Sequence, residues 1–116
     1  MKFMLLIHQG TTPLPGTPEW DALSGEEQGE VYAGYQAVNE TPGMTPGERM
    51  ADPADAKTVR VEDGGPILVD GPFAEIKEAL GDLLFLEADD LQAAVDLAAK
   101  IPAARMGGAV EIRPLL

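Results

Sequence analysis

The stretch Lys2-Phe3-Met4-Leu5-Leu6-Ile7-His8, at the start of the chain, decides the fold. Side chains of a β-strand point alternately to its two faces, and here the odd-numbered positions 3, 5 and 7 and the even-numbered positions 4 and 6 are all apolar. A strand that is apolar on both faces is typical of the centre of a covered sheet. Residues 83–87 show the same pattern, so we predict two such strands.

Capping signals place two helices around these strands. Ser24 is a favourable N-cap, and Glu27 three residues later completes a capping box, so we predict a helix over residues 25–38. Asp89 is the predicted cap of a second helix, which ends at Pro102. The other expected elements are two turns at residues 41–47, a weak strand at 48–51, a hairpin of strands 56–62 and 67–69 around a turn at 63–66, a short helix at 73–80 stopped by Gly81, and a strand at 109–113.

This order of elements reduces to β-α-β-β-α-β, the ferredoxin-like split motif. It indicates an α+β fold in a single domain that covers residues 1–116. The two helices would lie on one face of an antiparallel sheet. We expect Met4, Leu6, Leu84 and Leu86 on the opposite face, where an apolar surface needs cover. We therefore expect a homodimer in which two copies pack sheet to sheet.

Composition narrows the classes of function. The chain has 116 residues and a formal net charge of −12, which disfavours nucleic acid and anionic membranes as partners. It has no cysteine and one histidine, so we expect no metal site, no thiol chemistry and no cofactor. No stretch is long enough to span a membrane, and the apolar N-terminal run is too short for a signal peptide. The expected location is the cytoplasm.

A signature segment lies past the middle of the chain and reads Val69-Asp70-Gly71-Pro72-Phe73-Ala74-Glu75-Ile76-Lys77-Glu78. It resembles the signature of the YCII-related, or DGPF-domain, family. Residues 1–7 are similar to that family's first strand, and residues 99–105 and 110–114 to its last helix and strand. The resemblance implies a dimeric α+β barrel. It implies little about activity, because most members of this branch have no assigned function. Some relatives are fused to, or encoded beside, extracytoplasmic-function sigma factors.

A different branch, the YciI-like proteins, carries a histidine–aspartate pair in a dimer cleft, with the histidine on the first helix. Here the predicted first helix holds Tyr32 and Tyr35 at the candidate positions, and the only histidine, His8, ends the first strand. The pair therefore does not transfer to this chain residue by residue, and the fold alone does not imply an enzymatic activity.

The corner Asp70-Gly71-Pro72-Phe73 is the most informative candidate site. Gly71 can adopt a positive φ, and Pro72 suits the first position of a helix. In a structural interpretation, Asp70 caps the corner and Phe73 plugs the core or the dimer interface. In a functional interpretation, the corner places Asp70 at a cleft, with Lys77 nearby, to hold a polar ligand.

Two further residues have functional and structural interpretations. His8 ends a strand that would open toward a cleft, and histidine titrates near neutral pH. A general base needs a carboxylate that orients it, and Asp70 is the partner we predict; the alternative is a structural histidine. Trp20 follows a proline-rich loop at residues 10–18, and is either a hydrophobic staple before Ser24 or a lid over a pocket.

Two functions follow from these observations. The first is the binding of a small polar molecule, or a minor enzymatic activity, in a pocket between the sheet and the helices. Its predicted catalytic residues are His8 and Asp70, and its predicted ligand-binding residues are Tyr35, Phe73 and Lys77. The second is a protein–protein regulatory module associated with a sigma-factor-related protein, because the acidic balance suits a basic partner.

Overall fold

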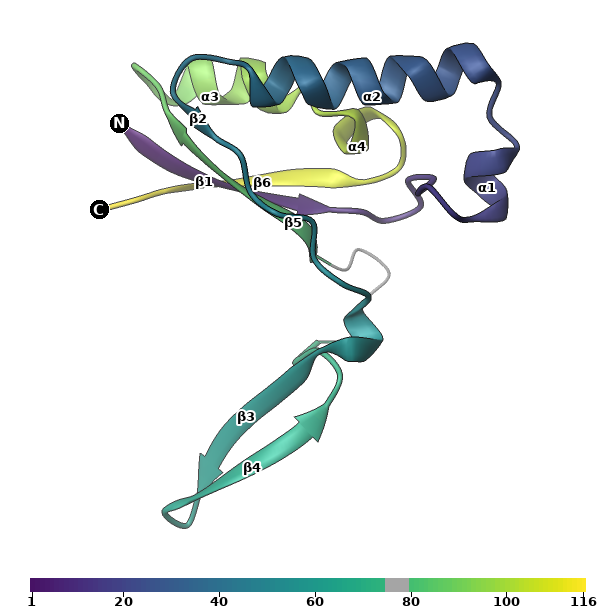
Figure 1. Ribbon diagram of the computed structural model, residues 1–116. Coiled ribbons are helices and arrows are strands. Elements are labelled where there is room, and N and C mark those ends of the chain that lie inside the picture. Colours follow the sequence, from purple (N-terminus) through teal and green to yellow (C-terminus); the bar gives the residue numbers. More distant parts are fainter. Residues whose placement is uncertain (75–79) are drawn as a thin grey trace.

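The computed structural model describes residues 1–74 and 80–116, and a four-stranded antiparallel sheet forms its centre (Figure 1). The strands lie in the order β2-β5-β1-β6, so the first strand lies between the third and the last strand of this sheet. That arrangement is the ferredoxin-like α+β fold predicted from the order of elements, which is thereby confirmed. The strands are β1 (Lys2–His8), β2 (Met44–Thr45), β5 (Leu80–Glu87) and β6 (Ala109–Pro114).

Two helices, α2 (Gly25–Asn39) and α3 (Leu91–Ala98), cover one face of the sheet (Figure 1). The predicted capping box begins α2. The Glu27 amide donates to the Ser24 hydroxyl at 3.1 Å, and the Ser24 amide donates to the Glu27 carboxylate at 3.0 Å. The short helices are α1 (Pro18–Asp21), the 3₁₀ turn η1 (Pro53–Asp55) and α4 (Pro102–Arg105).

The boundaries of α3 differ from the predicted ones. Asp90, and not Asp89, caps this helix, because its carboxylate accepts the Ala93 amide at 2.8 Å. The helix ends at Ala98, and Pro102 begins α4 instead of ending α3. Proline is favoured at the start of a helix because the first amides have no partner within the helix.

The pairing register decides which side chains face the helices. Leu5 lies opposite Leu84, and residues directly opposite each other in a sheet point to the same face. Leu84 and Leu86 therefore lie on the helix face. The prediction that they share a face with Met4 and Leu6 is wrong. Alternation within a strand shows which of its own residues share a face. Only the pairing register shows which face of one strand continues as which face of the neighbouring strand. The core comprises Phe3, Leu5, Ile7, Val38, Leu84, Leu86, Ala94, Leu97, Ile101 and Ala103.

The other face of the sheet is open in the single chain. Met4 lies opposite Phe85, and Leu6 lies opposite Leu83, so an apolar strip runs along the middle of this face. Phe85 is 42% exposed, while Met4 and Leu6 are half-buried. The sheet-to-sheet homodimer that would cover this strip stays a prediction.

In the segment that follows α2, strand pairing lies earlier in the chain than predicted. β2 pairs with β5 within the predicted turns at residues 41–47, and the predicted strand at 48–51 is reduced to a single bridge between Arg49 and Asp82. Gly47 makes the close approach possible, because a Cβ there would overlap the Leu83 carbonyl group. Backbone proximity of this kind depends on the partner strand and has no local sequence signal.

The predicted short helix at residues 73–80 lies largely outside the described residues. At its start, Phe73 and Ala74 form a bend, and at its end Leu80 and Gly81 belong to β5. The predicted end is therefore wrong. The Gly81 carbonyl accepts the Met50 amide at 2.9 Å, so pairing with a neighbouring segment extends the strand through the glycine.

β3 (Lys57–Glu62) and β4 (Gly65–Asp70) form a separate two-stranded hairpin that projects from the sheet (Figure 1). Asp63 and Gly64 form its turn, with φ of 50° and 76°, which is the pattern of a type I′ turn. The predicted hairpin is confirmed, although β4 begins two residues earlier than expected. Its apolar side chains are exposed, with Val61 at 69% and Leu68 at 64%.

The register predicts that truncation of two neighbouring leucines lowers the free energy of unfolding by different amounts. Leu84, which is 3% exposed, packs beneath the helices, so Leu84→Ala should lower the free energy of unfolding by about 2–5 kcal/mol. Leu83→Ala, on the open face, should lower it by less. Urea denaturation at low protein concentration measures both values. A larger loss for Leu83→Ala would contradict the register.

Candidate functional site

A cavity of 310 Å³ lies on the helix face, at the end of the sheet where β1 leads into a loop. We call it the helix-side cavity. Its walls come from the loop at residues 9–15, from α1, from α2, and from the end of β5 together with the segment after β2. It is therefore a pocket between the sheet and a helix, as the first functional hypothesis requires.

Trp20 on α1 forms an apolar wall of this cavity. Its side chain is 6% exposed, and its ring meets the Tyr32 ring edge-on with the centroids 5.3 Å apart. The Gln28 side-chain amide donates to the Trp20 carbonyl at 3.0 Å, which ties α1 to α2. Trp20 thus packs against the following helix and also borders a pocket, so both sequence-based alternatives describe part of its position.

Asp82 supplies a carboxylate to the cavity. It lies opposite Ile7, so its side chain is on the helix face, at the end of the inward-facing row of β5. Burial raises the pKa of this carboxyl, while the hydrogen bond from the Leu83 amide at 2.8 Å and the charge of Arg49 act in the opposite direction. An ionisable group at the end of an apolar row costs folding free energy, which makes it a candidate functional group.

Tyr35 and Arg49 line the same cavity. Burial raises the pKa of the Tyr35 phenol, and the negative charge of Asp82 raises it further. The hydrogen bond with the Ala103 backbone and the positive charge of Arg49 lower this pKa. Arg49 comes from the segment after β2, where it forms a bridge with Asp82. A carboxyl, a phenol and a guanidinium therefore meet at one cavity.

Two buried polar atoms of the described chain, Gln9 Oε1 and Thr12 Oγ1, have no hydrogen-bond partner. Both residues line the helix-side cavity. Gln9 packs over Gly81, where a Cβ would overlap its side chain, and the loop is held by the Thr11 amide, which donates to the Gly107 carbonyl at 3.2 Å. Buried polar groups are nearly always paired, so two unpaired oxygens in residues of one cavity wall are unusual.

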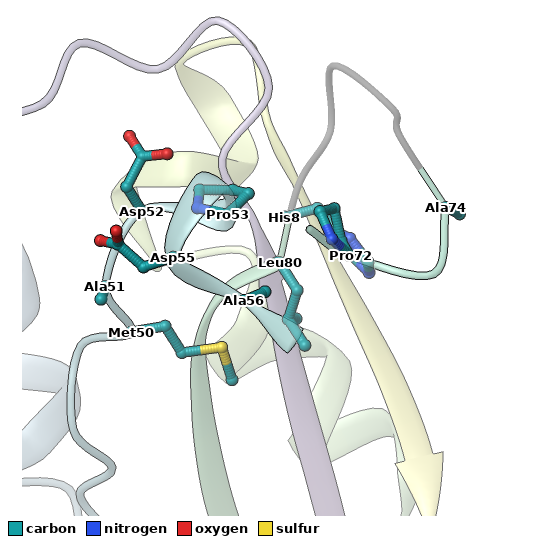
Figure 2. Close-up of a pocket in the computed structure, with 10 residues that line it drawn as sticks. All are labelled: His8, Met50, Ala51, Asp52, Pro53, Asp55, Ala56, Pro72, Ala74 and Leu80. Carbon is teal, nitrogen blue, oxygen red and sulfur yellow. The ribbon is translucent and has the colours of Figure 1, made fainter. Parts of the chain in front are cut away.

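A second cavity, of 430 Å³, lies between the end of β1, the segment before β3 and the corner after β4 (Figure 2). We call it the hairpin cavity. His8 Nε2 lies 3.3 Å from Glu111 Oε1, and the Asp52 carboxylate accepts the Ala54 amide at 2.9 Å. Two of its polar groups are thus already engaged within the protein, and most of the other side chains that line it are apolar.

The structure separates the predicted site residues. His8 lines the hairpin cavity, whereas Tyr35 lines the helix-side cavity on the other face of the sheet. Asp70 ends β4 in the hairpin, and its carboxylate accepts the Lys57 ammonium at 2.5 Å. The predicted pairing of His8 with Asp70 is therefore wrong. Glu111 takes that place because β6 lies beside β1 in the sheet, and its carboxyl pKa is held below the usual value by bonds from Arg113 and His8.

The corner after β4 differs from the structural interpretation. Phe73 is 79% exposed and lies under the Arg60 guanidinium, 5.8 Å from the ring centroid, so it does not plug the core of the chain. Gly71 has φ of 95°, which confirms its predicted positive φ, and its amide donates to the Ala56 carbonyl at 2.7 Å. This backbone bond, instead of a cap by the preceding carboxylate, closes the corner. Lys77 lies outside the described residues.

Sequence reasoning missed five polar residues that line the helix-side cavity: Gln9, Thr12, Asn39, Arg49 and Asp82. The sequence could have pointed to Asp82, because this residue directly precedes the predicted strand 83–87 and falls in its inward-facing row once the strand is extended toward the N-terminus. No such signal exists for Gln9 and Arg49. Both lie outside the strands, and contacts between segments far apart in the sequence bring them to the cavity.

In residues 1–74 and 80–116, no group of three or more histidine, aspartate or glutamate side chains is arranged to hold a metal ion. No helix within these ranges has the length and apolar character needed to cross a membrane.

Fold and cavity together define a small ferredoxin-like α+β protein with a polar pocket beneath its helices. The chain matches the YCII-related domain family over residues 1–116. A curated relative, an uncharacterised protein of Rhizobium meliloti (strain 1021), is 34% identical over 99 residues, which cover 81% of this chain and 80% of the relative. The chain therefore belongs to the YCII-related domain family, as its signature segment predicted.

Asp82 should make the folded protein less stable as the pH rises. Because its pKa is raised in the folded state, the folded chain holds this proton more tightly than the unfolded chain does. Its contribution to stability is therefore fully present below the ordinary aspartate pKa and is lost as the pH rises through the raised value. Arg49 is the charged group that acts on the Asp82 pKa across the cavity, and the charge of Asp82 in turn raises the pKa of Tyr35.

Asp82→Asn keeps an oxygen for the Leu83 amide but removes the buried charge. We predict that it raises the Tm at neutral pH and that the gain disappears near pH 3.5, about the ordinary aspartate pKa. Thermal denaturation monitored by circular dichroism measures both values. Asp89→Asn, at an exposed position, is the matched control and should change neither Tm. A loss of stability at neutral pH for Asp82→Asn would contradict the assignment.

Proposed function

We propose that this protein binds a small polar molecule in the helix-side cavity. The observation that carries the proposal is the convergence of Asp82, Arg49 and Tyr35 with two unpaired buried oxygens on one cavity of 310 Å³. Ligand sites are typically apolar concavities of about 300 Å³ or more, in which a few polar groups orient the ligand. Here Leu14 and Trp20 supply apolar surface, and the polar groups lie at the end of the sheet.

The polar groups of the cavity lower the stability of the free protein. An unpaired buried oxygen costs about 1–3 kcal/mol in lost hydration, and a partly buried carboxylate adds to that cost. A ligand that donates hydrogen bonds to Gln9 Oε1 would offset it and stabilise the folded state. This pattern of destabilising groups gathered at one cavity supports binding as the function.

Binding, rather than proton transfer by histidine, is the activity we assign to this cavity. His8 and its partner Glu111 lie on the open face of the sheet, whereas the cavity lies on the helix face. A general base must reach the proton that it removes, and the sheet separates His8 from a ligand in the helix-side cavity. The predicted catalytic role of His8 therefore does not form part of this proposal.

A thermal-shift screen with a library of small polar metabolites tests the proposal. At least one compound should raise the Tm, and Gln9→Leu, which removes the unpaired oxygen at similar size, should reduce that shift. His8→Ala and Asp70→Asn are matched controls outside the cavity and should leave the shift unchanged. A shift that depends on His8 and not on Gln9 would contradict the proposal, as would a library without a single hit.

We also propose that a second copy of the chain covers the open face, giving the dimeric α+β barrel that the sequence predicted. Two apolar surfaces are exposed on one chain: the strip with Phe85, and the hairpin with Val61 and Leu68. An isolated two-stranded hairpin is at best marginally stable in water and needs a packing partner. A copy related by a twofold axis offers the same two surfaces in return, so both can be covered in one isologous interface.

Analytical ultracentrifugation at micromolar concentration tests the dimer. The wild-type chain should sediment at twice the chain mass, and Phe85→Asp or Val61→Asp should shift it toward the monomer because a charge replaces exposed apolar surface. Val95→Asp on α3, where the valine is as exposed as Phe85 at 42%, should remain dimeric. A wild-type monomer under these conditions would overturn the proposal.

The alternative function, a regulatory module for a sigma-factor-related protein, draws on the exposed acidic residues Glu26, Glu27 and Glu30 along α2. These would suit a basic protein surface. That function makes no use of the helix-side cavity, so the metabolite screen separates the two: a ligand that depends on Gln9 favours binding, and the absence of any ligand favours the module.

A further inference from the structure

Opposite charges line the helix-side cavity without forming a side-chain ion pair within its described residues. Arg49 and Asp82 are joined by a backbone bridge, yet no ion pair within 4 Å joins their side chains among the described residues. Arg49 is exposed, whereas Asp82 is partly buried and lies at the end of the inward-facing row of β5. Arg49 thus marks the more exposed side of the cavity wall, the solvent side, and Asp82 marks the more buried, deeper side.

The deeper part of the cavity is rich in hydrogen-bond acceptors. One Asp82 oxygen accepts the Leu83 amide, and no hydrogen bond from residues 1–74 or 80–116 reaches the other. Gln9 Oε1 is buried without a partner, and its side chain packs over Gly81, the neighbour of Asp82. A carboxylate with an unused acceptor oxygen, in a cavity that Gln9 also lines, suits an ammonium group, which carries three donors and a positive charge.

The solvent side of the cavity suits the opposite charge. The guanidinium of Arg49 presents several N–H donors in a plane, which matches the two oxygens of a carboxylate. Between the two charged ends, Leu14, Trp20 and Val31 offer apolar surface for the middle of a ligand. The volume of 310 Å³ is at the small end of ligand pockets, so the molecule that fits is small.

We propose that the ligand of the helix-side cavity is a small zwitterion, an amino acid whose ammonium group binds Asp82 and Gln9 and whose carboxylate binds Arg49. The proposal rests on the proposed binding function of the same cavity. It adds the chemical class of the ligand, the direction in which it binds and the residue that recognises each end.

Isothermal titration calorimetry with a homologous series tests the ligand class. The probes are ω-amino acids from β-alanine to 6-aminohexanoate, together with the α-amino acids glycine, alanine and valine. For each ω-amino acid the controls are the alkylamine and the alkylcarboxylate of the same chain length. A charged hydrogen bond typically contributes enough for about a tenfold change in affinity, so the best zwitterion should bind at least about ten times more tightly than either singly charged analogue.

Two variants assign the two ends. Arg49→Gln should weaken the zwitterion about tenfold and leave the affinity of the matched amine unchanged, because only the carboxylate contact is lost. Asp82→Asn should do the reverse, weakening the zwitterion and leaving the matched carboxylate unchanged. Arg49→Lys keeps the positive charge and should retain part of the preference for the zwitterion over the matched amine. Arg60→Gln on the hairpin is the control for loss of a positive charge elsewhere, and circular dichroism confirms that each variant is folded.

The outcomes separate this inference from the proposed function. The assignment of a zwitterionic ligand is overturned if a zwitterion and its singly charged analogues bind equally. It is also overturned if Arg49→Gln leaves the binding of the zwitterion unchanged. Saturable binding of neutral polar compounds that depends on Gln9, with no binding of any amino acid in the series, overturns the zwitterion while the binding function stands. Absence of binding by every compound in this series and in the metabolite screen overturns both.

Discussion

Pairing of β1 with a neighbour on each side is the constraint on which the rest of the molecule depends. Leu5 is fully buried and lies opposite Leu84 on one neighbour and Ile112 on the other. A shift of one residue in this register would turn Met4 and Leu6 toward the helices and expose the present core. The apolar core beneath α2 and α3 therefore holds the register, and the register in turn holds the two helices over one face.

The same register creates the candidate site. Asp82 continues the inward-facing row of β5 past the end of the apolar core, so the strand geometry carries a carboxylate beneath α2. Gly47 and Gly81 allow the neighbouring backbone and the Gln9 side chain to come close, since a Cβ at either position would overlap them. The cavity thus gathers polar groups that have lost hydration, which is the balance between stability and function seen at many binding sites.

The two faces of the sheet carry different kinds of surface. The helix face ends in a polar cavity, and the open face and the hairpin expose apolar side chains. Self-association works against a formal net charge of −12 per chain, because two like-charged copies repel each other. Burial of the apolar strip must outweigh that repulsion. Since the proposed ligand site and the proposed dimer interface lie on opposite faces, either proposal can hold without the other.

The sequence by itself determined the α+β class, the capping box of α2, the hairpin turn and the family, because each depends on residues that are close in the chain. A run that is apolar on both faces predicted β1, and Asp63-Gly64-Gly65-Pro66 predicted a turn, which the structure forms with positive φ at Asp63 and Gly64. Only the tertiary structure decided that Glu111 meets His8, which face receives Leu84, and that Arg49, Gln9 and Asp82 line one cavity. Those outcomes depend on strand order and register, which are set by packing among segments far apart in the chain.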